Sequence, residues 1–112
     1  MNTTNSVQLI GHIGQTPKMV TLEGNQVLIS FSLATNYTVK KENNEKVKYT
    51  EWHNCVAFGS VASLINYYLK QGSYCLIHGS LRTRTYDDKA GVTHHRTEIV
   101  IGDVLFLDKP AT

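Results

Sequence analysis

Hydrophobic and polar residues alternate along most of this chain, and a period of two is typical of β-strands with one buried face. In the first stretch, Val7, Leu9 and Ile13 share one face, whereas Ile10 lies on the other, so this strand has apolar residues on both sides. Pro17 ends its pattern. The alternation predicts five strands, at residues 6–14, 27–40, 46–58, 73–86 and 95–107.

The period changes once, after Gly59, where apolar residues from Val61 to Tyr68 recur at helical spacing. Ser60 is the predicted N-cap of this helix and Gly72 its predicted C′ glycine. Three strands, a short helix and two strands is the order of an all-β, five-stranded OB-fold Greek-key barrel, with the helix between strands three and four. An SH3-like or another small barrel has a similar strand count, so the pattern alone leaves those folds open.

Length and composition indicate one folded domain. The chain has 112 residues, 41% hydrophobic and 18% charged, and we expect residues 1–107 to form the domain and 108–112 a short C-terminal end. Because no apolar run approaches the roughly 18 residues of a membrane span and the start of the chain does not resemble a signal peptide, we expect a cytoplasmic protein without membrane contact. Cys55 and Cys75 are expected to be buried free thiols.

Basic and aromatic side chains coincide on two of the predicted strands. A net charge of +2 does not by itself indicate nucleic-acid binding, so the placement of the cations matters more. Residues of equal parity share a strand face if no bulge intervenes. The candidate sets are Lys48, Trp52 and Phe58 on the third strand, and Arg82, Arg84 and Tyr86 on the fourth. Cations that track phosphates, beside rings on which bases stack, are what binds single-stranded nucleic acid.

Each of these residues also has a plainer interpretation. A Trp or Phe on a strand is more often part of the core than of a binding surface, and a pair of arginines is often a solvated strand edge. Lys40 belongs to a basic cluster at the second hairpin, but Glu42 and Glu45 offer it local partners, so a solvated hairpin tip explains it nearly as well.

The sequence contains no catalytic constellation. The five histidines form no HExxH motif and no zinc-ligand spacing with cysteines, and phosphate-binding glycine loops are missing. His53 and Cys55 have equal parity, but no third group orients the imidazole or lowers the thiol pKa. His94 and His95 point to opposite strand faces, which disfavours a shared metal shell. We therefore expect neither enzymatic activity nor a cofactor or metal.

Several stretches, in order and at matching spacing, make the chain resemble the bacterial single-stranded DNA-binding proteins. The resemblance runs from about Ser6 to Leu107. Its most specific elements are the Glu-Trp-His of residues 51–53 and the Gly-x-Leu-Arg-Thr-Arg of residues 79–84. The other matching stretches are residues 7–14 with Pro17, 31–35, 56–59 and 68–72.

The resemblance implies an OB-fold barrel that assembles as a homotetramer and binds single-stranded DNA without sequence preference, protecting it in replication, recombination and repair at the nucleoid. It assigns base stacking to Trp52, Phe58 and Tyr86. Many members carry a further stacking Trp where this chain has Val39, and Tyr37, of equal parity, is the candidate substitute.

The family usually continues through a linker into an acidic tail that recruits replication and repair proteins, whereas this sequence stops at Thr112. Partners recruited through such a tail are therefore not expected. Two alternatives stay open: a small, dimeric accessory OB protein of primosome assembly, or an OB-fold scaffold that binds protein or sugar. The motifs around Trp52 and Arg82–Arg84 favour the DNA-coating function.

Overall fold

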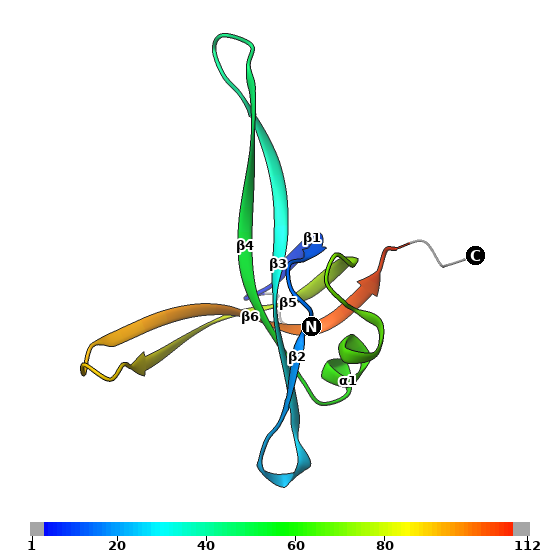
Figure 1. Cartoon of the computed structure of the whole chain (residues 1–112), viewed down its shortest axis with the longest axis vertical. Helices are drawn as coiled ribbons and strands as arrows, with labels where there is room; N and C mark the ends of the chain where they lie inside the picture. Colours follow the sequence, from blue (N-terminus) through cyan, green and yellow to red (C-terminus); the bar gives the residue numbers. More distant parts are fainter. Residues whose placement is uncertain (1–3, 109–112) are drawn as a thin grey trace.

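The computed structural model describes residues 4–108, which form six strands, one α-helix and a short 3-10 turn (Figure 1). The sheet order is β1-β5-β6-β4-β3-β2, and an additional pairing between β1 and β3 closes the five longer strands into a barrel. In chain order the elements are β1 (Val7–Ile13), β2 (Lys18–Thr21), η1 (Glu23–Asn25), β3 (Val27–Lys40), β4 (Lys46–Phe58), α1 (Gly59–Tyr68), β5 (Tyr74–Asp87) and β6 (Thr93–Phe106). The predicted barrel, with its helix between the third and fourth barrel strands, is confirmed.

The barrel core is built from the residues that alternation placed on the inner faces. Ile13, Ile29, Leu33 and Ile77 are fully buried, and α1 adds Ile65 at the end of the barrel that it covers. Burying such aliphatic side chains contributes about 1.5–3 kcal/mol each. The predicted strand faces are therefore correct. The described helix is too short to cross a membrane.

The β3–β4 and β5–β6 hairpins extend well beyond the barrel and contribute to the spread shape of the molecule (Figure 1). The β3–β4 register runs from Leu28↔Phe58 to Lys40↔Lys46 without a bulge, so parity holds along the whole hairpin. The β5–β6 register shifts once, between His78 and Gly79, and is regular beyond that point. At the outer ends of both hairpins the side chains of both faces are exposed. The hairpins therefore enlarge the surface available to a ligand.

Two details of the helix differ from the predictions. The predicted N-cap, Ser60, lies inside α1, and the N-cap position is occupied by Phe58 because β4 runs directly into the helix. The bend is made at Gly59, whose φ of +64° favours glycine. Gly72 is not the C′ residue, because α1 ends at Tyr68; Gly72 lies in the following turn with φ +88°.

A sixth strand, β2, was not predicted. It follows Pro17 and pairs with β3 from Lys18↔Ser30 to Thr21↔Val27. All four of its residues are exposed, so it has no buried face to generate a hydrophobic alternation. The predicted domain boundaries extend to residues 1–3 and 109–112, which lie outside the described residues.

Both cysteines are buried free thiols, as predicted. Burial raises the pKa of Cys55 to about 12 and that of Cys75 to about 11, from an ordinary value of 9.0. We expect neither thiol to react with an alkylating reagent at pH 9 in the folded protein, while both react after unfolding in urea. Mass spectrometry of the alkylated chain measures this. Alkylation of the native protein at the unfolded rate would contradict the buried, protonated state.

Candidate nucleic-acid interface

Trp52 and Phe58 lie on the outer face of β4, not in the core. Trp52 is 61% exposed and Phe58 46%, and their shared parity confirms that they point to the same side of the strand. Opposite Trp52 on β3 is the small residue Ala34, which leaves room for the indole. The ring lies against Gly14, where an added Cβ would collide with it. Gly14 therefore helps to seat the exposed indole.

The outer end of the β5–β6 hairpin carries its charged and aromatic residues in cross-strand rows. Arg82, Arg84 and Tyr86 share one face, as predicted. The rows are Tyr86 opposite His94, Arg84 opposite Arg96, and Arg82 opposite Glu98. Directly opposed residues of an antiparallel pair have side chains close enough to interact. This hairpin therefore presents one aromatic row followed by two charged rows.

The aromatic row is fixed by the turn that closes the hairpin. The Tyr86 ring stacks on His94 with centroids 5.2 Å apart, and His94 Nε2 donates to Asp88 Oδ2 at 2.8 Å. The backbone amides of Ala90 and Val92 donate to the other oxygen of Asp88, each at 2.9 Å. The hydrogen bond from His94, followed by the one from the Val92 amide, lowers the pKa of Asp88. The imidazole of His94, which is oriented by Asp88, thus supports one face of the Tyr86 ring.

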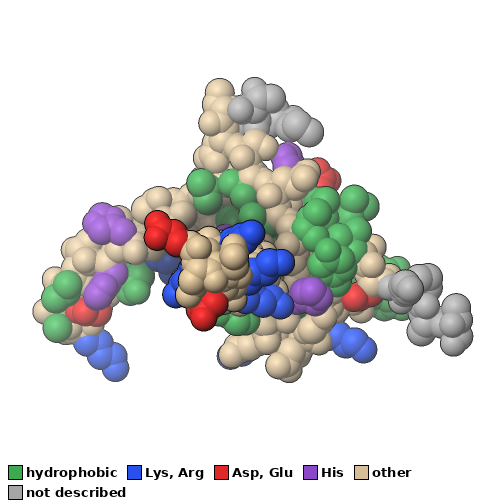
Figure 2. Space-filling model, turned by 90° about the horizontal axis from the view of Figure 1, so that it is seen from above, with side chains coloured by type: hydrophobic (Ala, Val, Ile, Leu, Met, Phe, Trp, Pro, Cys, Tyr) green, Lys and Arg blue, Asp and Glu red, His purple; other side chains and the backbone are tan. Residues whose placement is uncertain are grey.

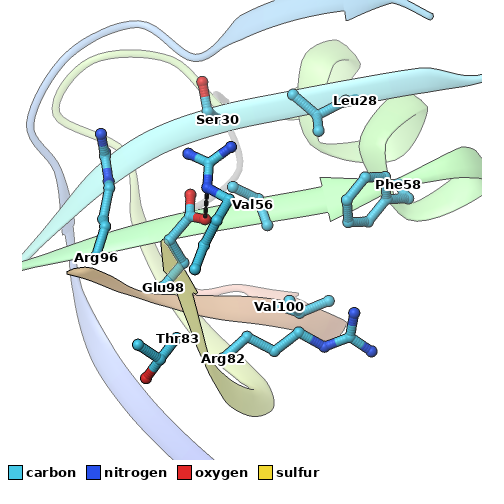
Figure 3. Close-up of a pocket in the computed structure, with 10 residues that line it drawn as sticks. Leu28, Ser30, Val56, Phe58, Arg82, Thr83, Arg96, Glu98 and Val100 are labelled. Carbon is cyan, nitrogen blue, oxygen red and sulfur yellow. Dashed lines mark ion pairs between the residues drawn. The ribbon is translucent and has the colours of Figure 1, made fainter. Parts of the chain in front are cut away.

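A groove of about 460 Å³ is lined by Phe58 from the first candidate set and by Arg82 and Arg84 from the second (Figure 3). The strands β4 and β6 meet in a short parallel pairing at Val56↔Val100, which brings the β3–β4 and β5–β6 hairpins together there. The close-up shows aliphatic side chains and Phe58 beside charged ones from β5 and β6. The lining residues are Leu28, Ser30, Val56 and Phe58 from β3 and β4, and Arg82, Thr83, Arg84, Arg96, Glu98 and Val100 from β5 and β6.

Lys48 and Lys40 are exposed on the β3–β4 hairpin, outside that groove. Lys48 is opposite Thr38 and Lys40 opposite Lys46, so both lysines share the outer face with Trp52. Seen from above, Lys and Arg side chains gather around the middle of the molecule, where this hairpin points toward the viewer (Figure 2). The structure therefore places both lysines on the hairpin face that carries Trp52, and not in the groove.

Tyr37 lies on the opposite face of the β3–β4 hairpin from Trp52. Its ring stacks on Tyr49 with centroids 5.4 Å apart, and its hydroxyl donates to Glu51 at 3.4 Å. Partial desolvation, and then the negative charge of Glu51, raises the pKa of Tyr37. Tyr37 shares a face with Val39, as parity requires, but it does not join the groove.

The catalytic alternatives gain no support from the geometry. His53 Nε2 lies 2.9 Å from the Thr35 hydroxyl, while the Cys55 thiol donates weakly to the His53 backbone oxygen at 3.7 Å. A raised thiol pKa is the reverse of what a nucleophilic cysteine needs. Residues 4–108 contain no group of three or more potential metal ligands.

Among the residues of this region that sequence reasoning missed are Gly14, Arg96 and Glu98. Parity along the last predicted strand does put Arg96 and Glu98 on one face. Their relevance, however, depends on which residues of β5 they oppose, and parity does not give that register. Gly14 was missed because nothing in the sequence indicates that the Trp52 ring lies against its backbone.

Comparisons with known proteins agree with this geometry. The chain matches the Single-strand binding protein family over residues 4–107. It is 39% identical over 104 residues to "Single-stranded DNA-binding protein 1" of Chlorobaculum tepidum, which covers 92% of this chain and 64% of that protein. It is 36% identical over 110 residues to the protein of the same name from Xylella fastidiosa, covering 97% and 81% of the two chains. This chain thus spans slightly under two thirds of the length of the first relative.

A solved structure described as the Plasmodium falciparum SSB complex with ssDNA has the same fold. It superposes with a TM-score of 0.88 at 33% sequence identity, and the match covers 96% of this chain and 98% of that one. Because the match covers 96% of this chain, it extends over the hairpins as well as the barrel.

Proposed function

The chain belongs to the Single-strand binding protein family, and from that premise we propose that it binds single-stranded DNA without sequence preference. The observation that supports this most is the groove lined by Phe58, Arg82 and Arg84, with the exposed Trp52 on the same face of β4 as Phe58. Both named relatives are single-stranded DNA-binding proteins, and the solved neighbour is a complex with ssDNA.

The proposed binding mode combines stacking with phosphate neutralisation. Bases stack on Trp52, Phe58 and Tyr86, and every base offers a π-face, so the interaction is tolerant of sequence. Arginines and lysines beside the rings contact the phosphates. The residues proposed for this second role are Arg82, Arg84, Lys48 and Lys40.

Binding of this kind covers exposed single strands and holds them unpaired during replication, recombination and repair, at the nucleoid. The proposed activity is binding and not catalysis. We assign it to residues 1–107. Tyr37 remains a candidate for a further stacking contact, on the opposite face of the β3–β4 hairpin from Trp52.

The only tryptophan of the chain, Trp52, gives a direct test at the site. Titrating the protein with oligo-dT should strongly quench its fluorescence, because a stacked base contacts the indole, and the corresponding duplex should cause little quenching. An unchanged emission with oligo-dT would argue against stacking at Trp52 and for a scaffold that binds another class of ligand.

Lys48 should contribute a phosphate contact that is visible in the salt dependence of binding. In Lys48→Ala, the slope of log K against log salt concentration should be smaller by about 0.7, the value for one phosphate contact on a single strand. Lys70→Ala is the matched control, because Lys70 is an exposed cation in the turn after α1, away from the groove. Equal slopes for the wild type and Lys48→Ala would remove Lys48 from the interface.

We also propose that the protein assembles as a homotetramer. The outer face of the β1-β5-β6 sheet carries an apolar cross-strand row in which Ile10, Leu76 and Leu105 are neighbours. Within residues 4–108, β1 pairs with β3 only at His12 and Ile13, so most of one β1 edge has no strand partner. A second copy related by a two-fold axis would pair along that edge and cover the apolar row. This contact makes a dimer, and a second interface joins two dimers into the tetramer.

Assembly strengthens the proposed binding, because several sites share one DNA strand. After the first site has bound, the next engages the strand at a high effective concentration. A dimer is the state expected instead for an accessory protein of primosome assembly. Light scattering at micromolar concentration distinguishes the two, and a mass near the 12.5 kDa of one chain would contradict any assembly.

A further inference from the structure

We propose that Arg84 and Arg96 together form one phosphodiester-binding site, and that Glu98 is the positioning residue that holds Arg84 in it. This inference rests on the proposed binding of single-stranded DNA. The inference goes beyond the proposed function because it gives roles to Arg96 and Glu98. It also places two arginines on a single phosphate.

The first observation is that two like charges face each other. Arg84 of β5 is directly opposite Arg96 of β6, and both line the same groove. Like charges in directly opposed positions destabilise an antiparallel pair. A local arrangement that costs stability without an evident gain in the free protein is most often found at a functional site. An anion between the two guanidiniums would remove the repulsion.

The second observation is that Glu98, the one carboxylate that lines the groove, is paired with Arg84. Glu98 Oε1 lies 3.1 Å from Arg84 Nε, and the Glu98 side chain is only 12% exposed (Figure 3). Glu98 is opposite Arg82 in the register, so it reaches Arg84 diagonally. Because Nε takes the carboxylate, the terminal nitrogens of Arg84 are left for an exposed ligand. Glu98 thus fixes the plane of the Arg84 guanidinium, in a groove that three arginines and this one carboxylate line.

The ligand class follows from the charges and from what lies beside them. Three guanidiniums and one carboxylate leave an excess of positive charge in the groove. Guanidinium forks match the oxygens of a phosphate. Next to them the groove is apolar and contains the exposed ring of Phe58. A phosphate beside a surface for a base is the chemistry of a nucleotide unit, not of an acidic peptide.

An adjoining hollow extends the same charged surface. It has a volume of about 150 Å³, shares Arg96, Glu98 and Ser30 with the groove, and adds Lys18 from β2. Arg96 is therefore a cation common to both hollows. A strand bound in the groove has a continuous basic path from Arg84 past Arg96 toward β2.

The salt dependence of oligo-dT binding, followed by Trp52 fluorescence, tests whether one phosphate is shared. Arg84→Gln and Arg96→Gln should each weaken binding about tenfold, as expected for loss of one charge-assisted hydrogen bond. Each should nearly keep the wild-type salt slope, because the other arginine still neutralises the phosphate. The double variant should lose about 0.7 of the slope. Lys89→Gln, which removes an exposed cation from the turn of the same hairpin, is the control.

Separate phosphates predict a different series. Each single variant would then lose about 0.7 of the slope and the double variant about 1.4, and that result overturns the shared site. A double variant that binds like the wild type overturns it as well. Neither result touches the proposed function, which fails instead if the wild-type protein does not bind oligo-dT at all. Circular dichroism confirms that each variant is folded.

Glu98→Gln tests the positioning role, because simple electrostatics and the positioning role predict opposite changes in DNA affinity. Removing a negative charge near the ligand should tighten DNA binding, as Glu23→Gln on the exposed β2–β3 turn is expected to do slightly. If Glu98 positions Arg84, Glu98→Gln instead weakens binding about threefold, for loss of a preorganised contact. In an Arg84→Gln background the same change should no longer weaken binding. Tighter binding by Glu98→Gln in the wild-type background would overturn the positioning role.

Discussion

Trp52→Ala should weaken the binding of single-stranded DNA by about 1–3 kcal/mol, which is roughly a 5- to 150-fold rise in Kd. The expected loss is large because the indole is the most exposed ring on this face and offers a wide stacking surface. The barrel should stay folded, since the residues that fill its core are on the other face of β4. Because the variant lacks the fluorescent residue, anisotropy of a labelled oligonucleotide is the measurement.

Tyr67→Ala is the matched control for this variant. Tyr67 is 80% exposed on α1 and lies outside the groove, so its removal should leave the affinity unchanged. Loss of the folded circular-dichroism spectrum in Trp52→Ala would show a structural role for the indole. An affinity equal to that of the wild type would show that no base stacks there.

Ile10→Asp should split the proposed tetramer at the β1 edge and so lower the mass of the assembled protein at micromolar concentration. Ile10 is 45% exposed in the isolated chain and lies on β1, at one end of the apolar row formed with Leu76 and Leu105. Losing its burial costs about 2 kcal/mol, and a two-fold contact contains the substitution twice. The total of about 4 kcal/mol raises the dissociation constant roughly a thousandfold, before the cost of burying a carboxylate is added.

Leu64→Asp provides the comparison, because Leu64 is 42% exposed on α1 and outside the sheet face. The mass of the Leu64→Asp variant, measured by light scattering, should equal that of the wild type. If Ile10→Asp keeps the assembled mass, the β1 edge is not the contact. The dissociated variant should also bind long oligonucleotides more weakly than the wild type, since fewer of its sites share one strand.

The fold was largely predictable because its strands are long and one of their faces is buried. Alternation at Ile29, Phe31 and Leu33 gives both the strand and its inner face without knowledge of any partner. The same signal fails for β2, which has no buried residue. It also fails at the helix ends, where Ser60 has the right chemistry for an N-cap but α1 already begins at Gly59, directly after β4.

The candidate site was predictable in part, for a related reason. Parity places Trp52 with Phe58, and Arg82 with Arg84, on single strand faces, and both groupings are correct. The register between β5 and β6 and the seat of the indole on Gly14 depend on how distant segments meet. Those features follow from barrel closure and have no local signal in the sequence.

The central claim, preference for single strands over duplex, is tested most directly by fluorescence anisotropy with one labelled oligonucleotide. The same mixed-sequence strand is titrated alone and after annealing to its complement, at equal salt. Exposed rings need unstacked bases, so the single strand should bind at least about a hundredfold more tightly, as expected when even one or two stacking contacts are lost. Equal affinities for the two forms would contradict the account, because they would leave phosphate attraction alone as the source of binding.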